Sequence, residues 1–426
     1  MVDGLLVGAY ERDNFGDLLF LDHTRHFLQG IETKACGLID ADMTGVGGAQ
    51  VAAYQPHLAG ERVPFLWVVG GETGGTTMRN AASMLGLSNS IRPDEIENQL
   101  NLPDFVSPYL PRPSRYPATT TSISIINSVG VSGIWSLSGR HRIETIAALQ
   151  EASFLSVRDL PSSAELRRLK IPHRLAPDLV HTIVNVIPDD VTTAQREIAL
   201  VQAKSKYIDQ IGVREFARIL LNSSALRRFQ IRLFSAGEAV GHDSRDQLVR
   251  VAGEFRGLGG GDRIDVSQAF TPEEKAKEIA TAGLWIGTSL HGYIISTSFN
   301  VPRVGLMLRK VRQYATSWEI PYPSAVPLRS LDDSVDAALQ AAKVSDGARL
   351  AANLSELAEQ NVLTARRLVE DAGEYDRGGF NAEIEKKLQR VSRTTETIER
   401  QYRRARRSRM RAAEVVRGFA RARDKR

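Results

Sequence analysis

Residues 283–302 read GLWIGTSLHGYIISTSFNVP, and this stretch decides the fold. Residues 284–286 are apolar and uncharged, as in a strand that is buried on both faces of a parallel sheet. Ser289 carries a hydroxyl that can cap a helix, and Asn300 and Pro302 end that helix after about three turns. The stretch therefore predicts a strand, a tight turn and a helix in an open α/β sheet.

His291 falls in the first turn of this predicted helix, at the carboxyl end of the strand, where open α/β sheets bind their ligands. The free N–H groups and the helix dipole favour an anion there and disfavour a charged imidazole. A neutral histidine in this position can act as a base near pH 7. The alternative interpretation is a buried histidine that is satisfied by a backbone carbonyl.

The composition is that of a globular protein. The chain has 426 residues, of which 42% are hydrophobic and 25% charged, enough for two domains and an appendage. No stretch approaches the roughly 20 apolar residues that a membrane helix needs. Asp3 stands where a signal peptide carries a cation, and the single cysteine, Cys36, cannot form an intrachain disulfide. We therefore expect a cytoplasmic protein.

The net charge of +5 comes from the C-terminal end of the chain. Residues 400–426 hold 12 Lys and Arg residues against two acidic residues, which leaves the remainder with a net charge of −5. A mildly acidic body argues against a nucleic-acid partner, because binding to phosphates requires a positive face on the body itself.

Polar turns follow the first strands of the N-terminal half. After the apolar run 5–10, Asn14 and Gly16 suit a tight turn and Asp17 can cap the following helix, so these residues form either a structural turn or a ligand loop. The next strand, 65–69, runs into Gly70 and Gly71, which let backbone approach a ligand or a helix. The proline-rich segment 103–121 is expected to be a surface loop beside the cleft.

A later strand, 153–157, ends in Arg158 and Asp159. An arginine at the tip of a buried strand can bind a carboxylate or phosphate with its forked guanidinium. The alternative is an Arg158–Asp159 ion pair that holds the turn.

Strands and helices alternate twice along the chain. We therefore predict an α/β protein with two doubly wound, Rossmann-like parallel-sheet domains that face a cleft, residues 1–190 and 191–345. Residues 346–426 form a helical, coiled-coil-like extension with the basic tail.

The extension contains two apolar patterns. The first fits one helix face, with Leu350, Leu354, Leu357, Val362 and Leu368. The second keeps heptad-like spacing over residues 384–419 and predicts a homodimer, a peripheral contact with the anionic inner face of the membrane, or a solvated helix. Deletion of residues 380–426 is expected to change assembly or vesicle binding and to leave the soluble reaction intact.

Taken together, these motifs resemble the polysaccharide pyruvyl transferase family over residues 4–320. The landmarks that carry the resemblance are Asn14-Phe15-Gly16-Asp17, Gly70-Gly71, Ser156-Val157-Arg158-Asp159, Pro177-Asp178, Ser289-Leu290-His291-Gly292, Asn300-Val301-Pro302 and Lys310. The resemblance implies a GT-B-like pair of domains. It also implies transfer of the enolpyruvyl carbons of phosphoenolpyruvate to two hydroxyls of a cell-surface glycan or its lipid-linked precursor, which gives a ketal and phosphate.

On this resemblance His291 is the candidate base and Arg158 the candidate catalytic cation. The candidate substrate-binding residues are Ser289, Gly292, Lys310, Asn14, Gly16, Asp17, Gly70 and Gly71. Phosphoenolpyruvate is the donor substrate, and neither a cofactor nor a metal is expected. Many family members carry arginine at the position of Ser289, so Arg158, Arg309 or Lys310 would have to supply the missing positive charge.

Two other functions fit the same architecture. One is a glycosyltransferase that uses a nucleotide sugar, which thermal stabilisation by that donor instead of phosphoenolpyruvate would reveal. The other is a non-catalytic interaction module with a degenerate cleft, for which replacement of His291 by alanine would have no effect.

Overall fold

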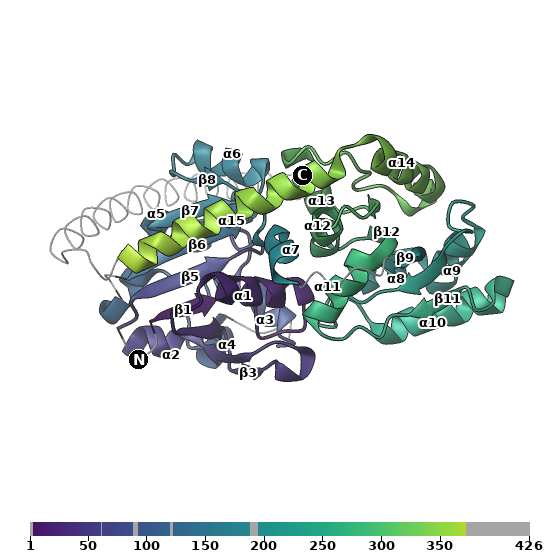
Figure 1. Cartoon of the computed structure of the whole chain (residues 1–426). Helices are drawn as coiled ribbons and strands as arrows, with labels where there is room; N and C mark the ends of the chain where they lie inside the picture. The colour runs from purple at the N-terminus through teal and green to yellow at the C-terminus, as the bar shows by residue number, and fades with distance from the viewer. Residues whose placement is uncertain (1–2, 61, 88–92, 120–121, 188–194, 372–426) are drawn as a thin grey trace, which may run out of the picture.

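The computed structural model describes residues 3–60, 62–87, 93–119, 122–187 and 195–371. Figure 1 shows two lobes side by side, each with a central sheet, and a long helix that runs over both. The N-terminal lobe comprises residues 3–187 and the C-terminal lobe residues 195–344, so the two predicted parallel-sheet units are confirmed. The boundary predicted at residue 190 lies outside the described residues.

The N-terminal sheet has eight strands in the order β3-β4-β2-β1-β5-β6-β7-β8. Its strands are β1 Gly4–Val7, β2 Thr33–Gly37, β3 Ala41–Asp42, β4 Gln50–Ala53, β5 Phe65–Val69, β6 Ile123–Val129, β7 Phe154–Val157 and β8 Arg174–Leu175. All neighbours pair in parallel except β3 and β4, which are antiparallel. The carboxyl ends of β1, β5, β6 and β7 therefore meet at one edge of the sheet.

The C-terminal sheet is parallel throughout, in the order β11-β10-β9-β12-β13. Its strands are β9 Gln195–Gln202, β10 Gln230–Leu233, β11 Ile264–Val266, β12 Ala282–Gly287 and β13 Arg303–Gly305. Gln202 at the end of β9 lies beside Gly287 at the end of β12. This pairing places the turn after β12 at the centre of the sheet edge.

Helices cover both sheets. In the N-terminal lobe they are α1 Phe15–Phe27, α2 Tyr54–Gly60, α3 Met78–Met84, α4 Pro93–Leu100, α5 Gly139–Glu151, α6 Leu160–Arg168 and α7 Ile183–Val186. In the C-terminal lobe they are α8 Ser205–Ile211, α9 Val213–Asn222, α10 Arg245–Phe255, α11 Pro272–Thr281, α12 Leu290–Ser298, α13 Arg309–Ser317 and α14 Leu331–Val344, and α15 Gly347–Asp371 follows.

Residues along each central strand alternate between two hydrophobic cores. Leu5 and Val7 of β1 pack into the outer core of the N-terminal lobe, while Leu6 packs on the opposite face, where one continuous core extends into the C-terminal lobe. On β5, Leu66 likewise packs into the outer core and Trp67 into the continuous core. This period of two is that of strands covered on both faces, and it explains why their sequences are apolar throughout.

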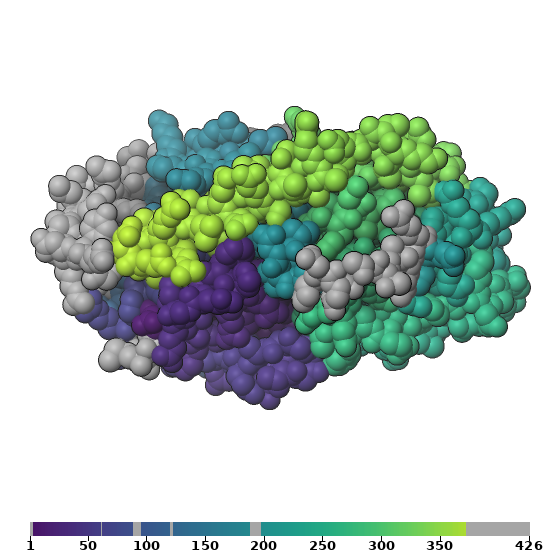
Figure 2. All heavy atoms as spheres, in the orientation of Figure 1, coloured from purple at the N-terminus to yellow at the C-terminus, as the bar shows by residue number. Residues whose placement is uncertain are grey.

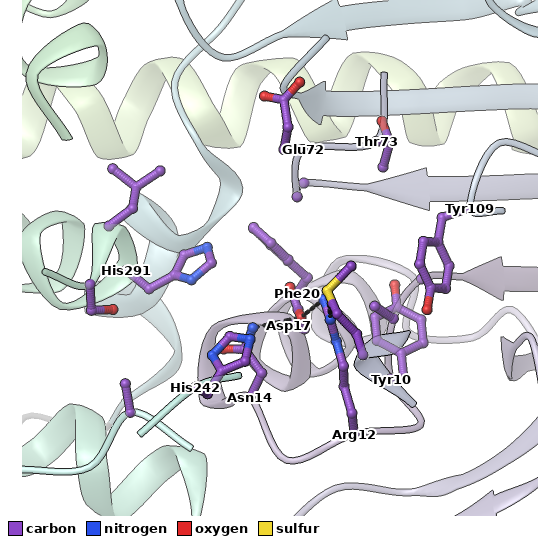
Figure 3. A pocket seen from close by; sticks show the side chains of 18 of the residues that line it. Tyr10, Arg12, Asn14, Asp17, Phe20, Glu72, Thr73, Tyr109, His242 and His291 are labelled. Atoms are coloured by element: carbon purple, nitrogen blue, oxygen red, sulfur yellow. Dashed lines mark hydrogen bonds and ion pairs between the residues drawn. The ribbon is translucent and has the colours of Figure 1, made fainter. Parts of the chain in front are cut away.

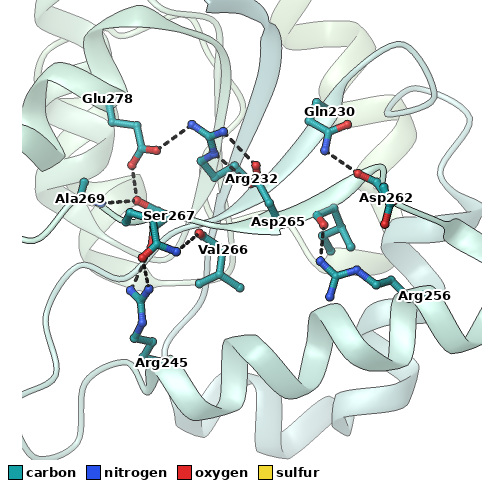
Figure 4. Close-up of polar contacts among 12 residues, drawn as sticks. Gln230, Arg232, Arg245, Arg256, Asp262, Asp265, Val266, Ser267, Ala269 and Glu278 are labelled. Atoms are coloured by element: carbon teal, nitrogen blue, oxygen red, sulfur yellow. Dashed lines mark hydrogen bonds and ion pairs between the residues drawn. The ribbon is translucent and has the colours of Figure 1, made fainter.

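The edge of the C-terminal sheet is held by polar contacts (Figure 4). The Arg232 guanidinium on β10 donates to both carboxylate oxygens of Asp265 on β11, each at 2.8 Å, and to Glu278 of α11 at 3.2 Å. Arg245 at the start of α10 donates to the Ser267 carbonyl at 2.9 Å. These contacts fix the short edge strand to its neighbour and to two helices.

Two helices of the C-terminal half bind the lobes together. Ser317 at the end of α13 accepts a hydrogen bond from the Leu160 N–H at 2.9 Å, and Trp318 donates its indole N–H to the Arg158 carbonyl at 2.8 Å. Helix α15 lies as a ridge across the surface of both lobes (Figure 2). Its Arg366 donates to the Phe27 carbonyl at 2.9 Å, so the chain returns to the N-terminal lobe after the second sheet is complete.

Several expectations about loops and the extension need correction. The segment 103–121 is not a simple surface loop, because Val106, Tyr109, Leu110 and Tyr116 are buried. The first apolar run of the extension does form a helix, α15, but Leu357 and Leu368 are exposed. The heptad pattern of residues 384–419 and the basic tail, with the dimer and membrane contacts predicted from them, lie outside the described residues. Within the part of the chain that is described, no helix is long and apolar enough to cross a membrane.

Candidate active site

A pocket of about 220 Å³ opens between the lobes, at the carboxyl ends of the central strands of both sheets. The N-terminal lobe contributes residues that follow β1 and β5 and the arginine that follows β7. The C-terminal lobe contributes residues that follow β9 and β12, the start of α13 and the loop before α10. The pocket therefore lies where the strand order of both sheets places a ligand site.

His291 enters this pocket from the first turn of α12. The Ser289 hydroxyl accepts from the Gly292 N–H at 3.2 Å and caps the helix, as the sequence predicts. The imidazole lies edge-on to Phe20 of α1, with ring centroids 5.0 Å apart, so it meets the opposite lobe directly (Figure 3). Its Nε2 is buried and has no hydrogen-bond partner among the described residues.

The surroundings of His291 keep its imidazole neutral. Burial lowers its pKa well below the ordinary value, and the positive charges of Arg158 and Lys310 lower the pKa further. The ring does not bond to a backbone carbonyl within the described part of the chain, so the geometry does not match the buried-histidine alternative. A neutral imidazole with an unbonded nitrogen in a pocket can accept a proton from a bound substrate.

Arg158 lies at the tip of β7 and is 4% exposed. Its Nη1 donates to Asp178 at 3.0 Å, whereas Asp159 accepts from the Ser162 N–H at 2.8 Å and caps α6. The alternative interpretation, an Arg158–Asp159 ion pair, is therefore wrong, and Arg158 pairs with Asp178 instead. Burial opposes the charge of Arg158, but Asp178, Asp159 and other carboxylates outweigh it and raise its pKa, so the side chain stays cationic.

The guanidinium of Arg158 has capacity left for a ligand. Its Nε is buried and finds no partner in the described residues. The residue lines the pocket together with His291. A buried cation that lines a cavity and has a free donor is suited to a carboxylate or a phosphate.

Two lysines add positive charge from the C-terminal lobe, Lys204 after β9 and Lys310 at the start of α13. The Lys310 side chain is exposed to solvent, but the surrounding protein partly desolvates its ammonium group. This desolvation lowers the pKa of Lys310, and the positive charges of Lys204 and Arg158 lower it further. Desolvation also lowers the pKa of Lys204. The positive charges of this wall repel one another when no anion is present, and an anion would relieve that repulsion.

The N-terminal turn 14–17 forms part of the opposite wall. Asn14, and not Asp17 as the sequence predicted, caps α1 by accepting from the Gly16 N–H at 3.3 Å. Asp17 accepts from Asn14 at 2.7 Å and from Arg12 at 2.8 Å. Gly16 does not line the pocket. Any side chain at this position would collide with Nδ1 of His291, so the turn is held close to the candidate base.

Gly70 and Gly71 are required by backbone conformation. Their φ angles are 58° and 72°, in the left-handed region that disfavours side chains. A Cβ on Gly70 would also collide with the Phe20 ring. The two glycines bring the chain after β5 along the pocket, and Glu72 and Thr73 follow them (Figure 3).

The structure brings eight of the ten candidate residues to one pocket: Arg158, His291, Ser289, Lys310, Asn14, Asp17, Gly70 and Gly71. Gly16 and Gly292 are outside its lining. A Cβ on Gly292 would collide with the Trp285 ring, so this glycine serves packing between α12 and β12. Arg309 is also outside the lining, and Lys310 is the basic residue that α13 presents to the pocket.

Sequence reasoning missed several residues of this pocket. They are Tyr10, Arg12, Glu72, Tyr109, Gln202, Lys204, His242 and Asp243. Tyr10, Arg12, Glu72, Gln202 and Lys204 lie at the carboxyl end of β1, β5 or β9 or within five residues of it, and this position is the signal that could have identified them. Tyr109 had no such signal, because it comes from the buried segment between α4 and β6 and donates to Glu11 at 2.8 Å.

Two α/β sheets on either side of a pocket define the GT-B-like fold. The chain belongs to the polysaccharide pyruvyl transferase family, whose model, described as polysaccharide pyruvyl transferase, matches residues 14–308. The resemblance stated from the motifs is thereby confirmed. No curated protein gave a significant sequence match.

Solved structures with a similar fold include two UDP-N-acetylglucosamine 2-epimerases. The enzyme from Rickettsia bellii has a TM-score of 0.50 and 10% identity, over 86% of this chain and 97% of its own. The enzyme from Methanocaldococcus jannaschii has a TM-score of 0.50 and 11% identity, over 84% and 100%. At such identities the likeness shows the GT-B-like fold alone.

Proposed function

We propose that this protein transfers the pyruvyl group of phosphoenolpyruvate to two hydroxyls of one sugar of a cell-surface glycan or its lipid-linked precursor, as a ketal. The observation that carries the proposal is the free Nε2 of His291 in one pocket with Arg158 and Lys310. A base and two cations from both lobes match a substrate pair of a neutral hydroxyl and an anionic donor.

The donor carries a carboxylate and a phosphate. Arg158 has a free Nε for one of these groups, and Lys310 and Lys204 provide ammonium donors for the other. An anion placed between these cations offsets the positive charge that lowers the pKa of His291. Donor binding would therefore raise the basicity of the imidazole at the moment when a base is needed.

The reaction balances with these groups. His291 takes the proton of the first sugar hydroxyl as the hydroxyl oxygen bonds to C2 of phosphoenolpyruvate. C3 takes a proton from solvent and becomes a methyl group, and His291 returns its proton to solvent, so that one O–H is added across the C2=C3 double bond. The second hydroxyl then displaces phosphate from C2, and its proton leaves with the phosphate. The products are one ketal and one phosphate, and no oxidant or reductant is consumed.

Phosphate release from phosphoenolpyruvate, with lipid-linked sugars as acceptors, tests the proposal. His291→Ala is expected to lower kcat by about 10²–10⁴-fold, the usual contribution of a general base. His26→Ala, at the end of α1 and outside the pocket lining, is the control and is expected to retain the wild-type rate.

Wild-type phosphate release in the His291→Ala variant would contradict the assignment of the base. A nucleotide sugar that raises the melting temperature where phosphoenolpyruvate does not would identify a glycosyltransferase instead. A chain that no anionic donor stabilises would be the non-catalytic module.

A further inference from the structure

Gln202 is the last residue of β9 and is 1% exposed. Its Oε1 accepts from the Thr288 N–H at 2.9 Å and from the Ser289 N–H at 2.8 Å. These are the two residues between β12 and α12, directly before the turn that carries His291. One amide oxygen therefore fixes the backbone from which the candidate base projects.

Asp243 determines which way this amide points. Both of its carboxylate oxygens accept from Gln202 Nε2 at 2.9 Å, and Oδ2 also accepts from the Ala236 N–H at 2.7 Å. A carboxylate accepts and does not donate, so it holds the Nε2 side of Gln202 toward itself and the Oε1 side toward the turn. Both side chains are buried, and their hydrogen-bonding groups are directed at protein.

The loop that carries Asp243 also contacts the other lobe. The Ala236 carbonyl accepts from the Phe15 N–H at 3.0 Å, and the Ala239 N–H donates to the Asp13 carbonyl at 3.0 Å. A continuous chain of hydrogen bonds therefore runs from the N-terminal turn through Asp243 and Gln202 to the turn before His291. Such a chain fixes a side chain at the boundary between the two lobes.

We infer that Gln202 and Asp243 are positioning residues for His291. They fix the first turn of α12, which carries His291, relative to the N-terminal lobe. This role rests on the proposed function of His291 as the base. Gln202 and Asp243 border the pocket, but their donors and acceptors are already used by Thr288, Ser289, Ala236 and each other. They act through the turn and not on the substrate.

An exchange of the two functional groups tests the inference. Gln202→Glu places two carboxylates against each other. Asp243→Asn replaces a carboxylate oxygen with an amide N–H that faces the N–H groups of Gln202 or Ala236. Each single variant is expected to lower kcat by about 10–100-fold, as for a base displaced by about 1 Å. In the double variant, the carboxylate now at position 202 accepts from the turn and from the amide now at position 243, and the oxygen of that amide accepts from the Ala236 N–H. The double variant keeps the net charge and is expected to recover to within about 5-fold of wild type, a coupling that independent sites do not show.

Gln247 and Asp209 provide a matched control, because Gln247 Nε2 donates to Asp209 at 2.6 Å in the same lobe and outside the pocket lining. The same exchange there is expected to leave kcat unchanged. Gln202→Met, which is uncharged and of similar size, replaces Gln202→Glu if that variant does not fold, and is expected to lower kcat by the same factor. KM for phosphoenolpyruvate in the double variant should stay within about 3-fold of wild type, because none of the cations that bind it is replaced and the net charge beside Lys204 is kept.

A second readout does not depend on activity. Histidine labelled with ¹³C at Cε1, with the His291 signal assigned from His291→Gln, is expected to show a shifted His291 signal in each single variant and the wild-type signal in the double variant. If wild-type protein releases no phosphate from phosphoenolpyruvate, the proposed function fails, and this signal alone decides the positioning role. Single effects that multiply in the double variant, or a loss that resides in KM alone, would overturn the inference.

Discussion

Gly16 and His291 come from different lobes, and each limits where the other can lie. The candidate base packs on the backbone of Gly16, where even a Cβ would overlap the imidazole ring. The ring is also held edge-on to Phe15 and Phe20 of the same helix. The position of His291 is therefore set by the opposite lobe as well as by its own turn.

This contact predicts that Gly16→Ala inactivates the protein. Gly16 lies in the first turn of α1, where alanine is intrinsically the better helix residue, so a loss would come from the collision with His291. Phosphate release is expected to fall by about 10²-fold through displacement of the base.

Gly253→Ala is the matched control, because Gly253 lies within α10 with open space around it. It is expected to raise the free energy of unfolding by about 0.5–1 kcal/mol and to leave phosphate release unchanged. Equal activity of Gly16→Ala and wild type would show that His291 is free to move.

The sequence predicted which residues would gather at the pocket better than it predicted their partners. The position of a polar residue at the carboxyl end of an apolar strand, or in the first turn of the helix that follows, was enough to identify Arg158 and His291 as candidates. It could not identify Asp178 as the partner of Arg158, because that contact spans 20 residues and depends on how β7 and the following 3₁₀ turn pack. The sequence pattern identifies the ends of strands, but the partner of a side chain at such an end depends on how the elements pack in three dimensions.

At the scale of elements, apolar runs revealed the central strands of the N-terminal sheet but not β2 and β4 beside them. These strands, Thr33–Gly37 and Gln50–Ala53, were missed because they are short and begin with polar residues. Helix α15 packs in part as the apolar pattern predicts, because Leu354 and Val362 are buried. Ala351, Ala358 and Ala365, which the pattern of larger apolar residues did not include, are buried on the same helix.

Asn361 fixes α15 to the N-terminal sheet. Its Nδ2 donates to Asn127 Oδ1 at 2.6 Å and to Ser156 Oγ at 3.0 Å, in a buried cluster at the ends of β6 and β7. Asn361→Ala is expected to lower the free energy of unfolding by about 1–3 kcal/mol, because it removes the hydrogen bonds that the Asn361 amide donates to a buried polar cluster. Chemical denaturation measures this change.

Asn353 lies on the exposed side of the same helix and is the control for Asn361. Asn353→Ala is expected to change the free energy of unfolding by less than about 0.5 kcal/mol, as surface replacements in helices usually do. If the two variants unfold alike, the buried cluster contributes nothing to the attachment of α15.

At the scale of the whole molecule, the two lobes form one packed body. The continuous core contains residues of β1, η5 (Leu179–Thr182), β9 and α12, so apolar contacts cross the boundary between the sheets. Polar contacts follow the same path, since His181 of η5 places Nδ1 2.9 Å from Ser298 Oγ of α12. The lobe interface therefore contains a fully buried titratable group.

Burial lowers the pKa of His181 to about 3. The unfolded chain binds a proton at this histidine near pH 6.5, whereas the folded protein does not, so acid favours unfolding between about pH 6.5 and pH 3. His23 has the same sign, because burial lowers its pKa to about 3 as well. Asp22 and Asp243 act in the opposite sense, because burial raises the pKa of each to about 6.

A variant comparison separates the contribution of His181 from these opposing groups. In His181→Asn the amide replaces Nδ1 as the partner of Ser298 and does not titrate. The variant is expected to be less stable than wild type at pH 7, but the difference in the free energy of unfolding should shrink by roughly 1–2 kcal/mol between pH 7 and pH 5. Ser298→Ala removes the hydrogen bond and keeps the histidine, so its difference from wild type should not change with pH. If the difference in the free energy of unfolding between His181→Asn and wild type is the same at pH 7 and pH 5, His181 takes up a proton in the folded protein as it does in the unfolded chain. Acid would then not destabilise the lobe interface through this histidine.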